Sequence, residues 1–156
     1  MKWRRLNGMQ LDLPIREEVE KTIKEETEKG FRLKVCIGTD SRVKAGSIEF
    51  ATVIVFLREH RGGFMFISNF NQKGQMSVKE RMINEVARSV EVAYNLCELF
   101  DRYNIELEIH ADINTDPGFQ SNSALRDAMG YVMSMGFVFK AKPDAFASTC
   151  CADKMV

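Results

Sequence analysis

Residues 34–41, with the sequence KVCIGTDS, form the stretch from which the fold can be worked out. Apolar residues recur at every second position up to Ile37, which is the period of a β-strand, and Asp40 falls on the opposite face. The strand therefore carries a carboxylate at the edge of the core. A second β-patterned stretch, residues 105–114 with the sequence IELEIHADIN, carries Asp112 in the same position. Two carboxylates at the ends of two strands predict a metal site.

The rest of the chain predicts further strands and helices around these two strands. We expect strands at residues 31–41, 48–60, 64–70, 105–114 and 137–141, where β-branched residues or two-residue alternation dominate. We expect helices at residues 15–29, 77–103 and 121–135, and a terminal helix from residue 144 onward. Ser77 and Glu80 have the spacing of a capping box. The expected apolar face of the third helix is Leu125, Met129, Val132 and Met133.

This order predicts an α/β fold with a mixed five-stranded sheet flanked by helices. The first three strands form an antiparallel meander, and the later strands alternate with helices. The 156 residues suit a single domain, 1–156, in which residues 1–30 form an N-terminal arm and helix. Residues 1–14 are expected to be irregular.

Composition excludes several classes of protein. The chain has 22 basic and 22 acidic residues, so it lacks the positive field of many nucleic-acid-binding proteins. No apolar run approaches the roughly 20 residues that span a bilayer, and the four cysteines form no C-x-x-C pair. We expect a cytoplasmic protein with reduced thiols and no membrane partner. A glycine-rich phosphate loop and a nucleophile elbow are both absent from the sequence.

Three short motifs connect these acidic residues to a known family. They are residues 37–41 (IGTDS), 109–114 (IHADIN) and 142–148 (KPDAFAS). With the order of elements, they resemble the ribonuclease H-like fold, and more closely the YkuK-type ribonuclease H-like family of bacterial proteins of unknown function. The resemblance implies four acidic site residues: Asp40, one acid in the long helix, Asp112, and one acid near the C-terminal helix.

Two of these four positions have alternatives. In the long helix, Glu80 fits the capping box, whereas Glu85 lies on the shoulder of the apolar stripe, so Glu85 is our choice. Near the C-terminus, Asp144 belongs to the motif that the family shares, and Asp153 lies about two and a half helical turns further on. The resemblance favours Asp144.

Four converging carboxylates would suit Mg²⁺ or Mn²⁺, and such ions promote in-line hydrolysis of phosphodiesters. The sequence therefore predicts a metal-dependent nuclease acting on RNA or DNA, with Asp40, Glu85, Asp112 and Asp144 as catalytic metal ligands. A non-catalytic module that binds nucleic acid or a protein partner is the alternative. Small basic groups, including Arg58 with Arg61, could contact phosphates, and Trp3 could stack on a base.

Overall fold

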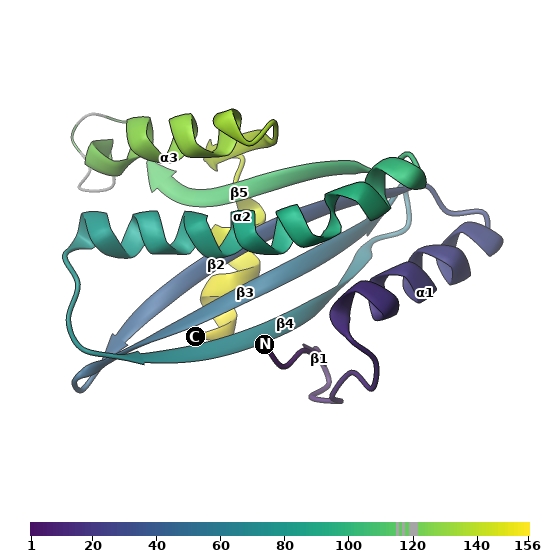
Figure 1. Ribbon diagram of the computed structural model, residues 1–156, viewed down its shortest axis with the longest axis horizontal. Helices are drawn as coiled ribbons and strands as arrows, with labels where there is room; N and C mark the ends of the chain where they lie inside the picture. The colour runs from purple at the N-terminus through teal and green to yellow at the C-terminus, as the bar shows by residue number, and fades with distance from the viewer. Residues whose placement is uncertain (115, 117, 119–121) are drawn as a thin grey trace.

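The computed structural model describes residues 1–114, 116, 118 and 122–156, with side chains described for all of these except residues 122–125. Its centre is a six-stranded sheet with the strand order β1-β4-β3-β2-β5-β6 (Figure 1). The strands are β1 (Arg4–Arg5), β2 (Leu33–Lys44), β3 (Ser47–Arg58), β4 (Gly63–Lys73), β5 (Glu106–Asn114) and β6 (Val138–Lys142). The helices are α1 (Ile15–Glu28), α2 (Val78–Arg102) and α3 (Asn122–Ser134), followed by a π-helix, η1 (Ala147–Ala152), and a short 3-10 helix, η2 (Asp153–Met155).

The pairing of the strands confirms the mixed sheet expected from the sequence. Strands β2, β3 and β4 form an antiparallel meander. The chain then crosses the sheet through α2 and returns as β5, which pairs with β2 in parallel. Strand β6 pairs in parallel with β5 on the outer side. The pairing of β2 with β5 therefore joins the meander to the later α/β part of the chain in one sheet.

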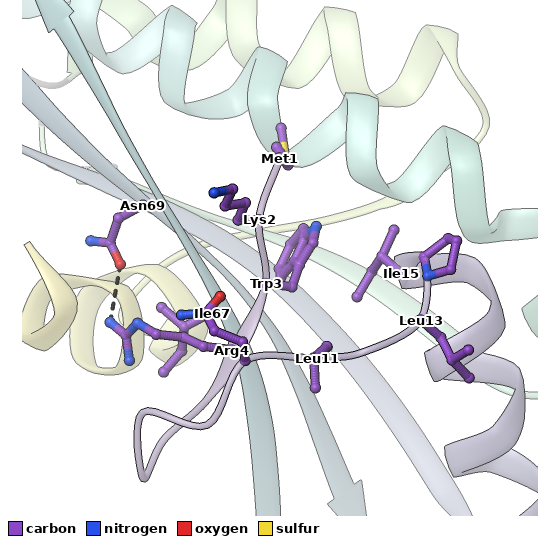
Figure 2. Close-up of a pocket in the computed structure, with 11 residues that line it drawn as sticks. Met1, Lys2, Trp3, Arg4, Leu11, Leu13, Ile15, Ile67 and Asn69 are labelled. Atoms are coloured by element: carbon purple, nitrogen blue, oxygen red, sulfur yellow. Dashed lines mark hydrogen bonds between the residues drawn. The ribbon is translucent and has the colours of Figure 1, made fainter.

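The sixth strand, β1, was not expected, because the N-terminal segment was predicted to be irregular. Arg4 and Arg5 pair antiparallel with Ile67 and Phe66 at the edge of β4. Two residues carry no periodicity from which a strand can be recognised. Figure 2 shows the segment beside β4, with Arg4 donating a 3.0 Å hydrogen bond to the side-chain oxygen of Asn69. Trp3 is only 6% exposed, so the suggestion that it stacks on a nucleic-acid base is wrong.

The helices divide between the two faces of the sheet. Helices α1, α2 and α3 contribute to the larger core on one face, where Val35 and Ile37 are completely buried. The C-terminal segment packs on the other face, against a smaller core that includes Cys36 and Val53. Figure 1 shows α2 in front of the sheet and the yellow C-terminal segment behind it. The alternation read from β2 is thus confirmed, because neighbouring side chains enter different cores.

Helix α2 begins as its sequence predicts. The Ser77 hydroxyl accepts a hydrogen bond from the Glu80 backbone N–H, and the Glu80 carboxylate accepts one from the Ser77 backbone N–H. The apolar stripe of α2 then packs on the sheet, with Val86, Ala93 and Leu96 buried. The capping box fixes where the helix starts, and the stripe fixes which side faces the sheet.

The apolar face expected for α3 is only partly correct. Val132 is buried, but Met129 and Met133 are 38% and 63% exposed. Ala128 is buried instead, and the side chain of Leu125 lies outside the described part of the chain. A small residue brings the helix close to the sheet, while the flexible methionines remain at the surface.

Within the described residues, no helix combines the length and the apolar character needed to cross a membrane.

Candidate metal centre at the end of the central strands

Asp40 and Asp112 lie side by side where the parallel pairing of the adjacent strands β2 and β5 ends, although β2 itself continues to Lys44. The parallel pairing of β2 with β5 ends at Thr39 and Ala111, and each Asp is the next residue of its strand. Parallel strands carry residues of the same register to the same edge of the sheet. The two carboxylates interact electrostatically. The adjacency expected from the two sequence motifs is therefore present in the fold.

Glu85 approaches the same place from α2. Its carboxylate accepts a 2.5 Å hydrogen bond from the hydroxyl of Ser41, the residue after Asp40. One turn further along α2, the buried Ser89 hydroxyl lies 2.8 Å from that of Thr39 and fixes the helix over β2. Glu85 is 3% exposed. Glu80, the alternative, is exposed and engaged in the capping box.

The fourth acidic residue beside Asp40 is Asp153 rather than Asp144. Asp153 interacts with the Asp40 carboxyl group, and this interaction raises the pKa of Asp40. Asp144 is exposed and lies just after β6, where its backbone N–H donates to the Ala141 carbonyl oxygen. The motif drew attention to Asp144, but the helical segment that follows carries Asp153 back to the end of β2. The expectation for Asp144 as the fourth member is corrected accordingly.

Burial and the repulsion of neighbouring charges raise the pKa values of two of these carboxyl groups, those of Asp40 and Glu85. Burial is the main cause of the raised pKa of Asp40, which reaches about 7, with further increases from Asp112 and Asp153. Burial also raises the pKa of Glu85 to about 8, and the charges of Asp40 and Asp112 add to the effect. Both groups hold protons near neutral pH unless a cation replaces them.

Lys142 brings a positive charge into direct contact with this group. Its Nζ lies 2.5 Å from Oδ1 of Asp112. The same Oδ1 is buried and makes no aligned hydrogen bond, so the contact is a short ion pair whose angles do not suit a hydrogen bond. Charge attraction depends little on angle, so the ion pair still neutralises Asp112. Lys142 is 39% exposed, so it can leave Asp112 for solvent without unfolding the strand.

A second group of potential ligands lies deeper between the same two strands. Among the described residues, Cys36, Glu108 and His110 are the one set whose ligand atoms all lie within 4.8 Å of one another. The His110 Nδ1 accepts a 3.2 Å hydrogen bond from the Ala147 backbone N–H. The ring proton must therefore be on Nε2, which lies 2.9 Å from the Glu108 carboxylate. Both ring nitrogens are in use, and burial raises the pKa of the Cys36 thiol to about 12.

The side chains of Cys36, Glu108 and His110 support the C-terminal segment, because their potential ligand atoms are already engaged in contacts within the protein. Lys34 forms a 2.8 Å ion pair with Glu108, which in turn holds His110. His110 then holds the backbone at the start of η1. Gly38 allows the segment to approach, because a Cβ there would lie 2.5 Å from the backbone nitrogen of Ser148. The segment that carries Asp153 is therefore fixed directly onto β2 and β5.

The donor atoms around Asp40 fit a hard divalent cation. Mg²⁺ and Mn²⁺ prefer carboxylate oxygens, and these four side chains offer no other kind of donor. Of the described residues, no three in this group bring ligand atoms within 4.8 Å of one another. The carboxylates are spread more widely than in a closed single-ion cage. That spacing is compatible with two ions about 3.5 to 4 Å apart, each held by only some of the acids.

The sequence did not reveal the partners that surround the acids. Ser41 follows Asp40 in the first motif, and its hydroxyl bonds Glu85. Lys142 begins the third motif, but no local pattern places it against Asp112. Arg58, considered for phosphate contact, makes two hydrogen bonds of 2.6 and 2.9 Å to the buried Glu26 instead.

Comparison with known proteins gives one result. Searches of curated proteins and of solved structures found no match. Residues 14–156 match the family described as Ribonuclease H-like. The match covers the meander, α2, β5 and the C-terminal segment, and the mixed sheet flanked by helices agrees with it. The chain therefore belongs to the ribonuclease H-like family.

Proposed function

We propose that the protein is a metal-dependent nuclease that hydrolyses phosphodiester bonds of RNA or DNA. The observation that carries this proposal is the gathering of four interacting carboxyl groups from four separate parts of the chain. Asp40 and Asp112 come from adjacent strands, Glu85 comes from α2, and Asp153 comes from the C-terminal segment. Family membership alone would not establish an activity, because one fold serves many functions.

The charges of the site support cation binding. Two buried carboxyl groups with pKa values of about 7 and 8 are costly to ionise without a counter-charge. A cation would remove that cost and leave the carboxylates ionised. When bound, Mg²⁺ or Mn²⁺ would supply Lewis-acid stabilisation of the charge that develops on the phosphate oxygens.

The residues of the site would then have distinct roles in binding the cations and the substrate. Asp40, Asp112, Glu85 and Asp153 would hold the cations. Ser41 keeps Glu85 in one orientation through their hydrogen bond. Lys142 neutralises Asp112 in the free protein, and once released it would lie within reach of a substrate phosphate.

The test is cleavage of end-labelled RNA and DNA oligonucleotides with and without Mn²⁺ or Mg²⁺. We expect cleavage that depends on the cation and is lost in Asp40→Asn. Asp153→Asn should reduce cleavage strongly, and Asp144→Asn serves as the matched control. Persistent cleavage by purified Asp40→Asn would refute the proposal. Equal loss in Asp144→Asn and Asp153→Asn would refute the assignment of the fourth acid.

The ion pair between Lys142 and Asp112 favours one alternative function. If the lysine permanently satisfies Asp112, the site needs no metal, and the protein is a non-catalytic module that binds nucleic acid or a protein partner. Thermal unfolding distinguishes the two. A working site should gain stability with increasing Mn²⁺ by mass action, whereas the module should unfold at the same temperature throughout the titration.

A further inference from the structure

An arginine and an exposed aromatic ring lie next to the candidate metal centre, on the face of the sheet that α2 covers. Arg88 follows Glu85 by three residues on α2, so the two side chains project from neighbouring turns. The Arg88 guanidinium lies over the rings of Phe50 and Phe70, at 4.4 and 4.2 Å from their centroids. Phe50 is buried, but Phe70 is 45% exposed.

The register of the sheet places these residues relative to the acids. Ser41, which bonds Glu85, is opposite Phe50 on β3, and Phe50 is opposite Phe70 on β4. Adjacent strands are about 4.8 Å apart, so Phe70 lies about 10 Å across the sheet from Ser41. The exposed ring is therefore about one or two nucleotides along an extended strand from Ser41 and from Glu85, the carboxylate that Ser41 bonds.

The arginines beside the acids are incompletely satisfied. The Nε atoms of Arg81 and Arg88 are buried and, in the described part of the chain, have no hydrogen-bond partner. Burial lowers the pKa of Arg88, and the charge of Glu91 offsets this only in part. Among the described residues, the guanidinium makes a 3.5 Å hydrogen bond to the uncharged Gln72 and no ion pair with a carboxylate. A guanidinium that is partly removed from water and whose Nε is unpaired is incompletely stabilised. A phosphate group at the surface would supply an anion in direct contact.

We propose that Phe70 and Arg88 form a binding surface for single-stranded nucleic acid beside the metal centre. An unpaired base would stack on the exposed part of the Phe70 ring, and Arg88 would contact the adjoining phosphate. Stacking needs a base whose face is free, so the surface selects single strands over duplex. The inference rests on the proposed nuclease in naming its substrate class, but the binding itself requires no cleavage.

The experiment measures binding by fluorescence anisotropy in EDTA, so that hydrolysis cannot occur. The probes are labelled 12-residue oligo(dT) and oligo(U), together with a blunt duplex of the same length. For the single strands we expect Phe70→Ala and Phe70→Leu to raise the Kd at least about fivefold, since a stacked base contributes about 1 to 3 kcal/mol. Phe70→Leu keeps apolar bulk in case the alanine variant fails to fold. Phe70→Trp should bind at least as tightly as wild type.

The matched control is Tyr94→Ala, because Tyr94 is an exposed aromatic residue on α2 well away from Glu85 along the helix. It should bind like wild type. Arg88→Gln should weaken binding to both single strands and reduce the slope of log K against log salt by about 1. Wild-type affinity in both Phe70→Ala and Phe70→Leu would overturn the inference. So would tighter binding of the duplex, or no binding of either single strand.

The outcome is separable from that of the nuclease proposal. Asp40→Asn should lose cleavage, yet its binding of single strands in EDTA should still weaken when Phe70→Ala is added. If the wild-type protein never cleaves but its binding still depends on Phe70, the nuclease proposal fails and the binding surface stands. If the wild-type protein cleaves but its binding does not depend on Phe70, the nuclease proposal stands and the binding surface is refuted.

Discussion

The substitution Glu85→Gln tests whether the buried carboxyl groups of the site are poised to bind a cation. The carboxyl group of Glu85 is 3% exposed, and burial raises its pKa from 4.5 to about 8. In the unfolded chain the same group releases its proton above its ordinary pKa. The folded protein therefore holds a proton that the unfolded chain does not, and the stability of the fold falls as the pH rises from about 4.5 through about 8.

The size of the effect follows from the pKa shift. Each pH unit between the unfolded and folded pKa values costs about 1.4 kcal/mol. At pH 7 this amounts to about 3 kcal/mol for Glu85, an upper value because the titration of Glu85 is coupled to that of Asp40. Gln keeps an oxygen that can accept the Ser41 hydrogen bond and has no proton to lose. We expect Glu85→Gln to raise the free energy of unfolding by about 2 to 3 kcal/mol at pH 7.

The assay is urea denaturation in EDTA, followed by circular dichroism at pH 5.5, 7 and 8.5. The wild type should lose stability across this range relative to Glu85→Gln. The matched control is Glu98→Gln, because Glu98 is a 75% exposed residue of the same helix. Its ion pairs lie at the surface and contribute at most about 0.5 kcal/mol each. The reasoning is refuted if Glu85→Gln is no more stable than wild type at pH 7, or if the difference does not grow with pH.

Two further predictions concern the support of the site and its internal cation. Gly38→Ala should lower the free energy of unfolding by about 2 kcal/mol and increase hydrogen exchange in residues 147–152, because its Cβ would meet the Ser148 backbone nitrogen at 2.5 Å. Gly130→Ala, with nothing within 4 Å, is the control, and equal exchange in the two variants would contradict the prediction. Lys142→Ala should tighten Mn²⁺ binding several-fold in calorimetry at pH 7, since the lysine occupies Asp112. Lys140→Ala should not, and unchanged affinity in Lys142→Ala would show that the ion pair does not compete with the metal.

Much of the fold can be predicted because its strands and helices carry clear periods. The two-residue alternation of β2 separates Ile37 from Asp40, and the stripe of α2 selects its buried face, so the sheet, its meander and the long helix are expected correctly. The two-residue β1 could not be predicted, because its pairing with Ile67 depends on the exposed edge of β4. The exposed methionines of α3 were misjudged since helical spacing alone does not show how far a stripe extends.

In the candidate site too, some residues can be placed from sequence, whereas others depend on how distant segments pack. Asp40 and Asp112 can be placed together from sequence because parallel strands in the same sheet end at one edge. Asp153 could not, because its position depends on how the C-terminal segment packs over Gly38 and on the hydrogen bond from Ala147 to His110. The pairing of Lys142 with Asp112 likewise arises only when β6 is placed beside β5.

The parallel pairing of β2 with β5 has a consequence for how the protein folds. Residues that meet across it, such as Cys36 and Glu108, are 72 positions apart in the chain. The hairpins of the meander can form early, since their ends are close in sequence. Joining β5 to β2 requires closure of a long loop, which is entropically slow. Asp40 and Asp112 therefore become neighbours only in this late step, and a divalent cation present during refolding should accelerate it by screening their repulsion.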